Sequence, residues 1–280
     1  ASSLGGGMYN YEYSSPTLTD CIFSGNTAGF GGGMYNGYRS SPSVTDCAFN
    51  ENTANSGGGM YNSNYSSPPL INCSFSENSA AVMGGGIYNF YSASTLTNCS
   101  ISENTAGSGG GMYNSYSSPS LISCIFSSNS VTGDGGAVYS DTSSTTMLKN
   151  CTIIGNTAGN KGGGFYNYTT YMTLKNCILW DNNATIANNE IYFLYSSTSI
   201  TSCDIKGSGG SGAGWDTSLG TDNGGNIDLD PLFIGAPSNL QLQSSSPCID
   251  TGTSTGAPAT DILGVARPQG LGVDMGAYEQ

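Results

Sequence analysis

Apolar residues recur along most of the chain at a spacing of about 26 residues. Eight cysteines mark this spacing, each with an aliphatic residue three positions before it and another apolar residue two positions after it. The intervals between successive cysteines are 26, 26, 26, 25, 27, 26 and 26 residues. A fixed period in this range predicts a solenoid of stacked units. The eight cysteines are Cys21, Cys47, Cys73, Cys99, Cys124, Cys151, Cys177 and Cys203.

Each unit is predicted to hold three short strands separated by turns. In the second unit the strands fall at residues 34–35, 43–45 and 47–49, and Cys47 and Phe49 are expected to face the same side. Gly-Gly-Gly, Ser-Ser-Pro and Asn-Thr-Ala segments supply the turns. Helices do not tolerate such segments in most copies. The sequence therefore predicts an all-β protein, a parallel β-helix of about eight coils in residues 1–206, with an irregular segment in residues 207–280 that caps and completes the solenoid.

Two polar or aromatic columns follow the same period. Seven units carry Asn five positions after the cysteine, and we expect these amides to stack at a turn and bond to one another. Each unit also carries a Tyr in its first strand, and we expect its side chain to point outward. This Tyr column would form a surface that binds glycans or another chain, or it would only cover the Gly-rich turns. The Asn column is Asn26, Asn52, Asn78, Asn104, Asn129, Asn156 and Asn182. The Tyr column is Tyr9, Tyr35, Tyr61, Tyr88, Tyr113, Tyr139, Tyr166 and Tyr192.

The repeated motifs resemble those of a known family. Gly-Gly-Gly-Met-Tyr-Asn, as at residues 5–10, followed by Cys-x-Phe-x-x-Asn, resembles the repeats of the chlamydial polymorphic outer-membrane proteins over residues 4–206. The segments at 230–233, 246–252 and 274–279 resemble the C-terminal portion of secreted β-helix proteins. The resemblance implies a right-handed, pectin-lyase-like β-helix at a cell surface. It implies little about chemistry, because one fold hosts many functions.

Composition narrows the function. The chain has no His, 6 Lys and Arg, and a formal net charge of -13. Ser-His-Asp or Cys-His catalysis and His-based metal sites are thereby excluded, and nucleic acid is not expected as a partner. No apolar run approaches the roughly 20 residues of a membrane-spanning helix. The opening residues 1–3 favour a mature chain whose signal peptide has been removed, and so an extracellular or cell-surface protein; a trimmed chain is the alternative.

The sequence offers few metal or thiol sites. Cys-x-x-Cys clusters are absent, so the cysteine column is expected to consist of free buried thiols, with disulfides between neighbouring coils as the alternative. No cofactor is predicted. Four carboxylates in a Gly-rich loop are weak candidates for a calcium site, against the simpler interpretation that they are ordinary loop residues. They are Asp216, Asp222, Asp228 and Asp230.

Enzymatic and ice-binding functions are weakly supported. Lys149 and Lys175 share a column, but no carboxylate cluster accompanies them in the same coils, so the chain is predicted not to be an enzyme. Thr-x-Thr pairs in the second strand would suit ice binding, yet Ile71 and Ile122 interrupt that column.

The two ends of the repeat array differ. No cap is visible before the first Gly-Gly-Gly, whereas an irregular segment follows the last repeat. Unlike ends favour head-to-tail contacts, which build open filaments. The main hypothesis is therefore a non-enzymatic extracellular structural or surface protein that self-associates end to end. A glycan-binding adhesin is the alternative, and a polysaccharide-active enzyme or ice-binding protein comes third.

Overall fold

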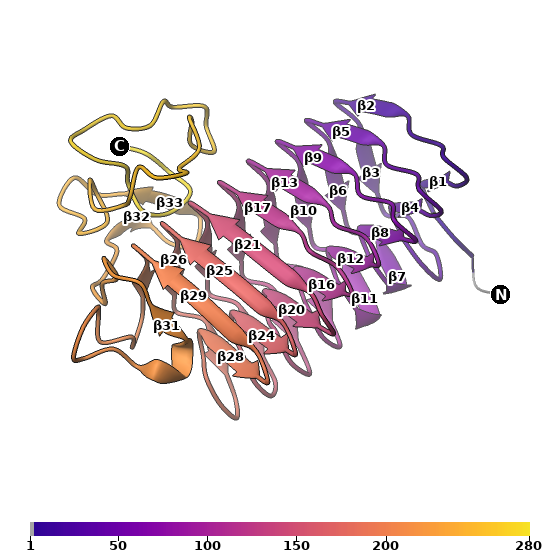
Figure 1. The fold of residues 1–280 in the computed structure, drawn as a ribbon. Coiled ribbons are helices and arrows are strands. Elements are labelled where there is room, and N and C mark those ends of the chain that lie inside the picture. Colours follow the sequence, from indigo (N-terminus) through magenta and orange to yellow (C-terminus); the bar gives the residue numbers. More distant parts are fainter. Residues whose placement is uncertain (1–2) are drawn as a thin grey trace.

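Each repeat winds into one coil, and eight coils stack into a rod of short parallel strands (Figure 1). The computed structural model describes residues 3–280. Ala1 and Ser2, on which the prediction of a processed N-terminus partly rests, lie outside the described residues. The stacked parallel coils confirm the predicted fold class. Within residues 3–280, no helix is both long and apolar enough to cross a membrane.

The first strand of each coil belongs to an eight-stranded parallel sheet, which we call the Tyr sheet. Met34 pairs with Met60 one coil further on, so the register advances by one repeat per strand. Met34 and Asn36 point inward and are fully buried, while Tyr35 between them faces outward, as strand alternation requires. The strands are β1 (Met8–Asn10), β4 (Met34–Asn36), β8 (Met60–Ser63), β12 (Ile87–Phe90), β16 (Met112–Ser115), β20 (Val138–Asp141), β24 (Phe165–Tyr168) and β28 (Ile191–Leu194).

The second strand of each coil forms the Leu sheet, named for its inward aliphatic column. Leu70 and Leu96 are paired in it and fully buried. A ninth strand from beyond the repeats extends this sheet. The strands are β2 (Thr17–Thr19), β5 (Ser43–Thr45), β9 (Pro69–Ile71), β13 (Thr95–Thr97), β17 (Ser120–Ile122), β21 (Thr145–Lys149), β25 (Tyr171–Lys175), β29 (Ser197–Thr201) and β31 (Thr221–Asp222).

The third strand of each coil forms the Phe sheet. Cys47 and Phe49 are both buried, as their spacing of two predicts. The rings of Phe49 and Phe75 stack at 4.6 Å between centroids, so one aromatic column runs along the core. The strands are β3 (Ile22–Ser24), β6 (Ala48–Asn50), β10 (Ser74–Ser76), β14 (Ser100–Ser102), β18 (Ile125–Ser127), β22 (Thr152–Ile154), β26 (Ile178–Trp180) and β30 (Asp204–Ile205).

A fourth sheet, the Ala sheet, stands where the sequence predicted only an Asn-Thr-Ala turn. Its backbone pairs with the neighbouring coil because every turn in a stack has an identical turn beside it; Ser79, for example, pairs with Thr53 and Thr105. The small inward side chains of Ala80, Ala106 and neighbours form their own buried cluster. The strands are β7 (Thr53–Ser56), β11 (Ser79–Met83), β15 (Thr105–Ala106), β19 (Ser130–Val131), β23 (Thr157–Ala158) and β27 (Asn183–Ala184).

The Gly-Gly-Gly segments let the chain turn from the Ala sheet into the Tyr sheet. Gly84 has a φ of +66°, in the left-handed region that favours glycine. A Cβ on Gly85 would lie 2.5 Å from the carbonyl oxygen of Gly110 in the next coil. The glycines are therefore required by the close approach of stacked backbones rather than by flexibility.

The residues after the last repeat form two consecutive parts, which lie in different places. Residues 207–227 cover the end of the rod: Leu219, in the 3-10 helix η1 (Thr217–Leu219), and Trp215 join the main core, and β31 pairs with β29. The rest folds back along the flank and includes the hairpin β32 (Phe233–Gly235) and β33 (Asn239–Leu242) (Figure 1). The structure thus differs from the expected cap, because only the first third of this segment covers the end.

Apolar residues on the outside of the repeats mark the place where the C-terminal segment docks on the flank. On the outer face of the Phe sheet, Ile125, Ile154 and Ile178 are buried under the C-terminal segment through contacts with Leu240, Leu242 and neighbours. The positions equivalent to Ile125 in the four earlier coils are Ile22, Ala48, Ser74 and Ser100, and Ile22, which no C-terminal residue covers, is 73% exposed. Burying Ile125, Ile154 and Ile178 is favourable by roughly 1.5–3 kcal/mol each.

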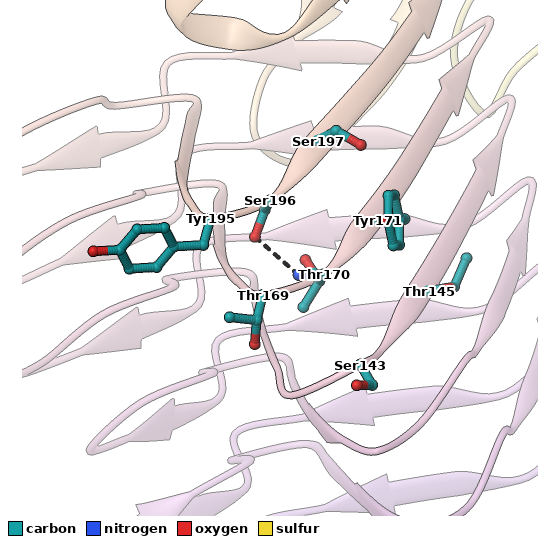
Figure 2. A pocket seen from close by; sticks show the side chains of 8 residues that line it. All are labelled: Ser143, Thr145, Thr169, Thr170, Tyr171, Tyr195, Ser196 and Ser197. Atoms are coloured by element: carbon teal, nitrogen blue, oxygen red, sulfur yellow. Dashed lines mark hydrogen bonds between the residues drawn. The ribbon is translucent and has the colours of Figure 1, made fainter.

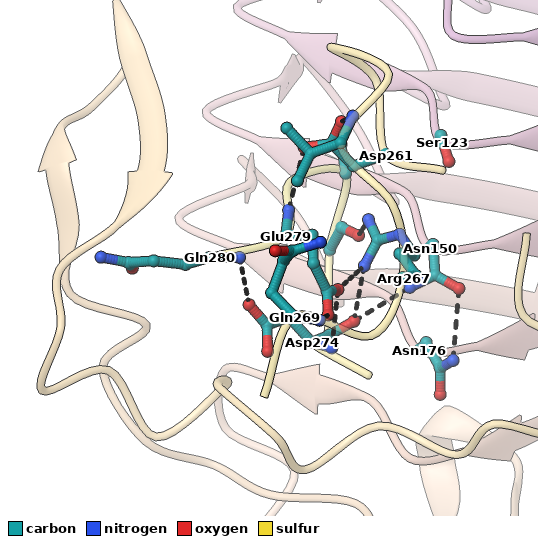
Figure 3. A network of polar contacts seen from close by, with 12 residues as sticks. Ser123, Asn150, Asn176, Asp261, Arg267, Gln269, Asp274, Glu279 and Gln280 are labelled. Atoms are coloured by element: carbon teal, nitrogen blue, oxygen red, sulfur yellow. Dashed lines mark hydrogen bonds and ion pairs between the residues drawn. The ribbon is translucent and has the colours of Figure 1, made fainter. Parts of the chain in front are cut away.

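A buried ion pair holds the final residues together (Figure 3). Arg267 Nη1 lies 2.6 Å from Glu279 Oε2, and neither side chain is exposed. Arg267 also donates to the carbonyls of Asp274 and Gly276. Asn150, on the solenoid, donates to the Asp274 carbonyl at 2.9 Å, which fixes the segment to the coils.

Candidate functional site

The predicted Asn column forms a hydrogen-bonded ladder inside the solenoid. Asn78 Nδ2 donates to Asn104 Oδ1 at 2.9 Å and to the Phe49 carbonyl at 2.8 Å, and the Asn78 backbone N–H donates to the same Oδ1. These amides satisfy one another and the backbone. Their role is structural, since they are buried. The same pattern links Asn26, Asn52, Asn78, Asn104, Asn129, Asn156 and Asn182.

A second Asn ladder lies under the Tyr sheet, and the sequence analysis missed it. Asn36 donates to Asn62 at 2.8 Å, and Asn62 donates to Asn89 at 3.0 Å. The ladder begins at Asn10 and reaches Asn114. Its signal was the last residue of Gly-Gly-Gly-Met-Tyr-Asn, which recurs at the same period.

The cysteine column lines the core as free thiols. All nine cysteines in the described residues are unpaired, and only Cys21 is partly exposed. Each of the eight repeat thiols donates to a backbone carbonyl two residues earlier, as Cys47 does to Thr45 at 3.1 Å, whereas Cys248 donates to Asp204 Oδ2. Cys21, Cys47, Cys73, Cys99, Cys124, Cys151, Cys177 and Cys203 are thus packing residues.

The Tyr column is not the open surface that the sequence suggested. Its rings lie flat on one another; Tyr113 and Tyr139 stack at 4.6 Å with an interplanar angle of 6°. Successive coils lie about 4.8 Å apart, close enough for the rings of neighbouring coils to stack, so each ring covers the next. Tyr35, Tyr88 and Tyr113 are buried, Tyr61, Tyr139, Tyr166 and Tyr192 are half-buried, and Tyr9 in the first coil is exposed.

The exposed aromatics lie one turn further along the coil. We call the connection between the Tyr sheet and the Leu sheet the Ser turn. Tyr65 in this turn is 67% exposed and has a φ of +65°, in the left-handed region that non-glycine residues adopt mainly in turns. Exposed Tyr side chains occur in or beside the turn along the whole rod. They are Tyr11, Tyr13, Tyr38, Tyr65, Tyr91, Tyr116, Tyr168, Tyr171 and Tyr195.

Serine hydroxyls fix the backbone of the Ser turn. The Ser40 backbone N–H donates to Ser66 Oγ at 3.0 Å, and the Ser66 N–H donates to Ser92 Oγ at 3.2 Å. Ser92 and Ser117 continue the ladder. The turn is therefore rigid, while its other hydroxyls, such as Ser118, remain exposed.

Cavities follow the Ser turn from end to end. Tyr13, Tyr38, Arg39 and Tyr65 line a cavity of about 350 Å³ near the first coils. A cavity of about 220 Å³ follows, between Tyr65 and Tyr116. Two larger ones, of about 610 and 560 Å³, lie at the last coils. We call this row of hollows the turn groove.

The four calcium candidates do not converge. Asp222 accepts from the N–H groups of Gly212 and Gly224, while Asp228 accepts from those of Gly207 and Gly209. Asp216 caps η1 through the Ser218 N–H, and Asp230 accepts from the Leu232 N–H. In residues 3–280 no three acidic or Cys side chains gather where they could hold a metal ion. These carboxylates shape the loop instead.

The columns considered for catalysis and ice binding lie on the outside of the Leu sheet. Lys149 and Lys175 are paired neighbours there, and Lys175 Nζ donates to the Thr255 carbonyl at 3.2 Å. Ile122 pairs with Lys149, so the outward Thr column is broken as the sequence indicates.

Stacked coils, inner ladders and an outer groove define a parallel β-helix protein. The family model described as "Right handed beta helix region" matches residues 12–179, and the chain belongs to the right-handed β-helix family. The chain is similar to the solved structure titled "Crystal structure of pectate lyase Pel9A", with 15% identity, a TM-score of 0.49, and coverage of 92% of this chain and 69% of that one. No curated protein matches the sequence.

These comparisons correct one prediction and sharpen another. The prediction that the chain is not an enzyme is wrong as stated, because a pectate lyase is among the structures it resembles. At 15% identity the likeness is one of fold, and no residue role is transferred from it. The expected right-handed β-helix is confirmed. The finer resemblance to chlamydial repeats and the secreted location remain predictions.

Proposed function

We propose that this protein binds a polysaccharide chain along the turn groove. The observation that carries the proposal is the row of exposed Tyr side chains on the Ser turn, running parallel to the rod axis. Aromatic rings offer flat apolar faces on which sugar rings stack, and hydroxyls beside them fix orientation by hydrogen bonds. The exposed aromatic surface exceeds what scattered surface residues explain.

The spacing of the groove suits a polymer. Tyr91 and Tyr116, in successive coils, stack with ring centroids 4.4 Å apart and an interplanar angle of 5°, so the faces between them are covered and a sugar would meet their edges and outer faces. Successive strands in a sheet lie about 4.8 Å apart. An extended chain of pyranose sugars has a repeat of similar length, so successive coils would meet successive sugars.

A glycan array probed with the purified chain tests this proposal. We expect binding to linear polysaccharide fragments and a loss of at least about tenfold in affinity when Tyr65 and Tyr116 are both changed to Ala, from loss of roughly 1–3 kcal/mol of aromatic contact. Ile186→Ala is the matched control, since Ile186 is 64% exposed but lies outside the groove.

Binding and cleavage need separate measurements. Polysaccharides that bind should be incubated with the protein and assayed for new chain ends and for the unsaturated products of a lyase. Either outcome is compatible with the groove as the binding site. Absence of binding to every glycan on the array would contradict the proposal.

A further inference from the structure

The cavities of the turn groove are larger at its C-terminal end, where two of them adjoin. The first, of about 610 Å³, lies over the last three Ser turns (Figure 2). The second, of about 560 Å³, lies between the last coil and the residues that cap the rod. Ser196 and Ser197 line both. The two hollows therefore adjoin at these serines and together make up the candidate site.

A wall closes this site. Trp215, Thr217, Gly220 and Thr221 come from the cap and line the second cavity opposite the last coil. The wall is firmly held: Trp215 Nε1 donates to the Gly220 carbonyl at 2.8 Å, and β31 pairs with β29. A Cβ on Gly220 would lie 2.5 Å from the Thr198 carbonyl, so the wall backbone lies directly against the coil.

Two exposed rings stand at the closed end. Tyr171 is 67% exposed and Tyr195 is 79% exposed. Figure 2 shows them on opposite sides of the turn, with Thr169, Thr170 and Ser196 between them. This arrangement gives flat apolar faces at the sides and hydroxyls at the base, as a sugar requires.

The charges at this end disfavour acidic sugars. No charged side chain lines the first cavity. The second has Asp222, whose carboxylate accepts from Gly212 N–H at 3.0 Å, Gly224 N–H at 2.9 Å, Ser211 Oγ at 2.8 Å and Asn226 Nδ2 at 2.7 Å. The backbone hydrogen bonds above all lower its pKa to about 2, so it remains an anion. A uronic acid would meet a like charge and no cation.

We infer that the closed end of the groove holds the terminus of an uncharged glycan chain. The inference rests on the proposed function of the turn groove and names its ligand class. A chain lying along the coils meets the cap as an end stop, and its last sugars lie between Tyr171, Tyr195 and the wall. The N-terminal part of the groove carries the preceding sugars.

Calorimetric titration distinguishes the ligand classes. The probes are cellohexaose, xylohexaose and mannohexaose as neutral chains and hexagalacturonate as the acidic one, with long polymers of the same sugars. We expect at least one neutral hexamer to bind and the acidic hexamer to bind at least about tenfold more weakly. A polymer should show a capacity that follows its number of chain ends rather than its mass of sugar.

An exposed tyrosine and an exposed isoleucine serve as variant and control. Tyr195→Ala should weaken neutral hexamer binding by about tenfold or more. Ile186→Ala removes an exposed apolar side chain that lies outside the groove and should change hexamer affinity by less than about twofold. Unfolding temperatures of both variants should match that of the unaltered protein, because both side chains lie on the surface.

The outcomes separate the two proposals. Stronger binding of hexagalacturonate, or a capacity that follows sugar mass, would overturn the inference while leaving the groove as a polysaccharide site. Equal losses from Tyr195→Ala and Ile186→Ala would also overturn it. Absence of binding to every hexamer, polymer and arrayed glycan would remove both the inference and the proposed function.

Discussion

The inner Asn ladder ends on a carboxyl group, and this end should make the stability of the protein depend on pH. The position five residues after Cys203 is Ser208, so Asn182 has no Asn in the next coil. Glu190 replaces it: Asn182 Nδ2 donates to Glu190 Oε2 at 2.5 Å, and the Asn182 N–H donates to Oε1 at 3.3 Å. Glu190 stands where earlier repeats have the third glycine of Gly-Gly-Gly.

Burial is the main cause of the pKa change at Glu190. It raises the pKa from 4.5 to about 8, opposed by the hydrogen bonds from Asn182 and the charge of Lys206, while Asp181 adds to the increase. A folded pKa above the unfolded one means that the folded state binds the proton more tightly. The stabilisation is complete below about pH 4.5 and is lost as the pH rises to about 8, and the full change is about 5 kcal/mol at roughly 1.4 kcal/mol per pH unit.

The substitution Glu190→Gln tests this pH dependence of stability, because it keeps the size of the side chain and removes the titrating carboxyl group. Urea unfolding at several values between about pH 4.5 and pH 8 gives the free energy of unfolding for both proteins. We expect the variant to gain stability relative to the unaltered protein as the pH rises, by up to about 5 kcal/mol.

The difference between the two proteins is needed because other buried carboxyls titrate in the same range. Burial also raises the pKa of Asp204 to about 7 and that of Asp274 to about 6. Their effects cancel in the comparison. Glu51→Gln, in an exposed turn, is the matched control for the removal of one carboxylate. Parallel loss of stability in the unaltered protein and Glu190→Gln would refute the reasoning.

Four further predictions concern the coils. Asn104→Ala leaves buried backbone and amide groups without partners, so it should lower the free energy of unfolding in urea by about 3–5 kcal/mol. The control Glu103→Ala, at an exposed position, should lower it by less than about 1 kcal/mol. Gly85→Ala should prevent folding or lower the unfolding temperature by at least about 10 °C. Gly235→Ala should do neither, because a Cβ there would have no contact shorter than 3.8 Å. Equal shifts in unfolding temperature would contradict the argument that stacked backbones require glycine at position 85. Intact mass after alkylation should show Cys21 modified first in the native protein and all nine cysteines after denaturation; prior oxidation of the column would appear as missing labels. End-to-end self-association should appear as concentration-dependent growth in sedimentation velocity, and a constant monomer at high concentration would count against it.

Much of the fold follows from the sequence because a stacked coil repeats its environment. Any residue in one coil lies between the residues at the same position in the neighbouring coils, as Phe49 lies between Phe23 and Phe75, so a period of 26 fixes register, core and ladders together. The inward position of the cysteines followed from their spacing to Phe. The Ala sheet was missed because Thr-Ala alone has the composition of a turn, and only the neighbouring turns make it a strand.

The sequence by itself determined the right-handed coil architecture, the inner columns and the exclusion of His chemistry. Only the tertiary structure decided which aromatics are exposed: Tyr35 is covered by stacking in the Tyr sheet, while Tyr65 is exposed in the turn that follows it. It also decided that the cap from Trp215 to Thr221 closes the turn groove beside Tyr195. The physical reason is that a period along the chain fixes contacts between equivalent residues, whereas ring exposure and cap position depend on contacts between unlike ones.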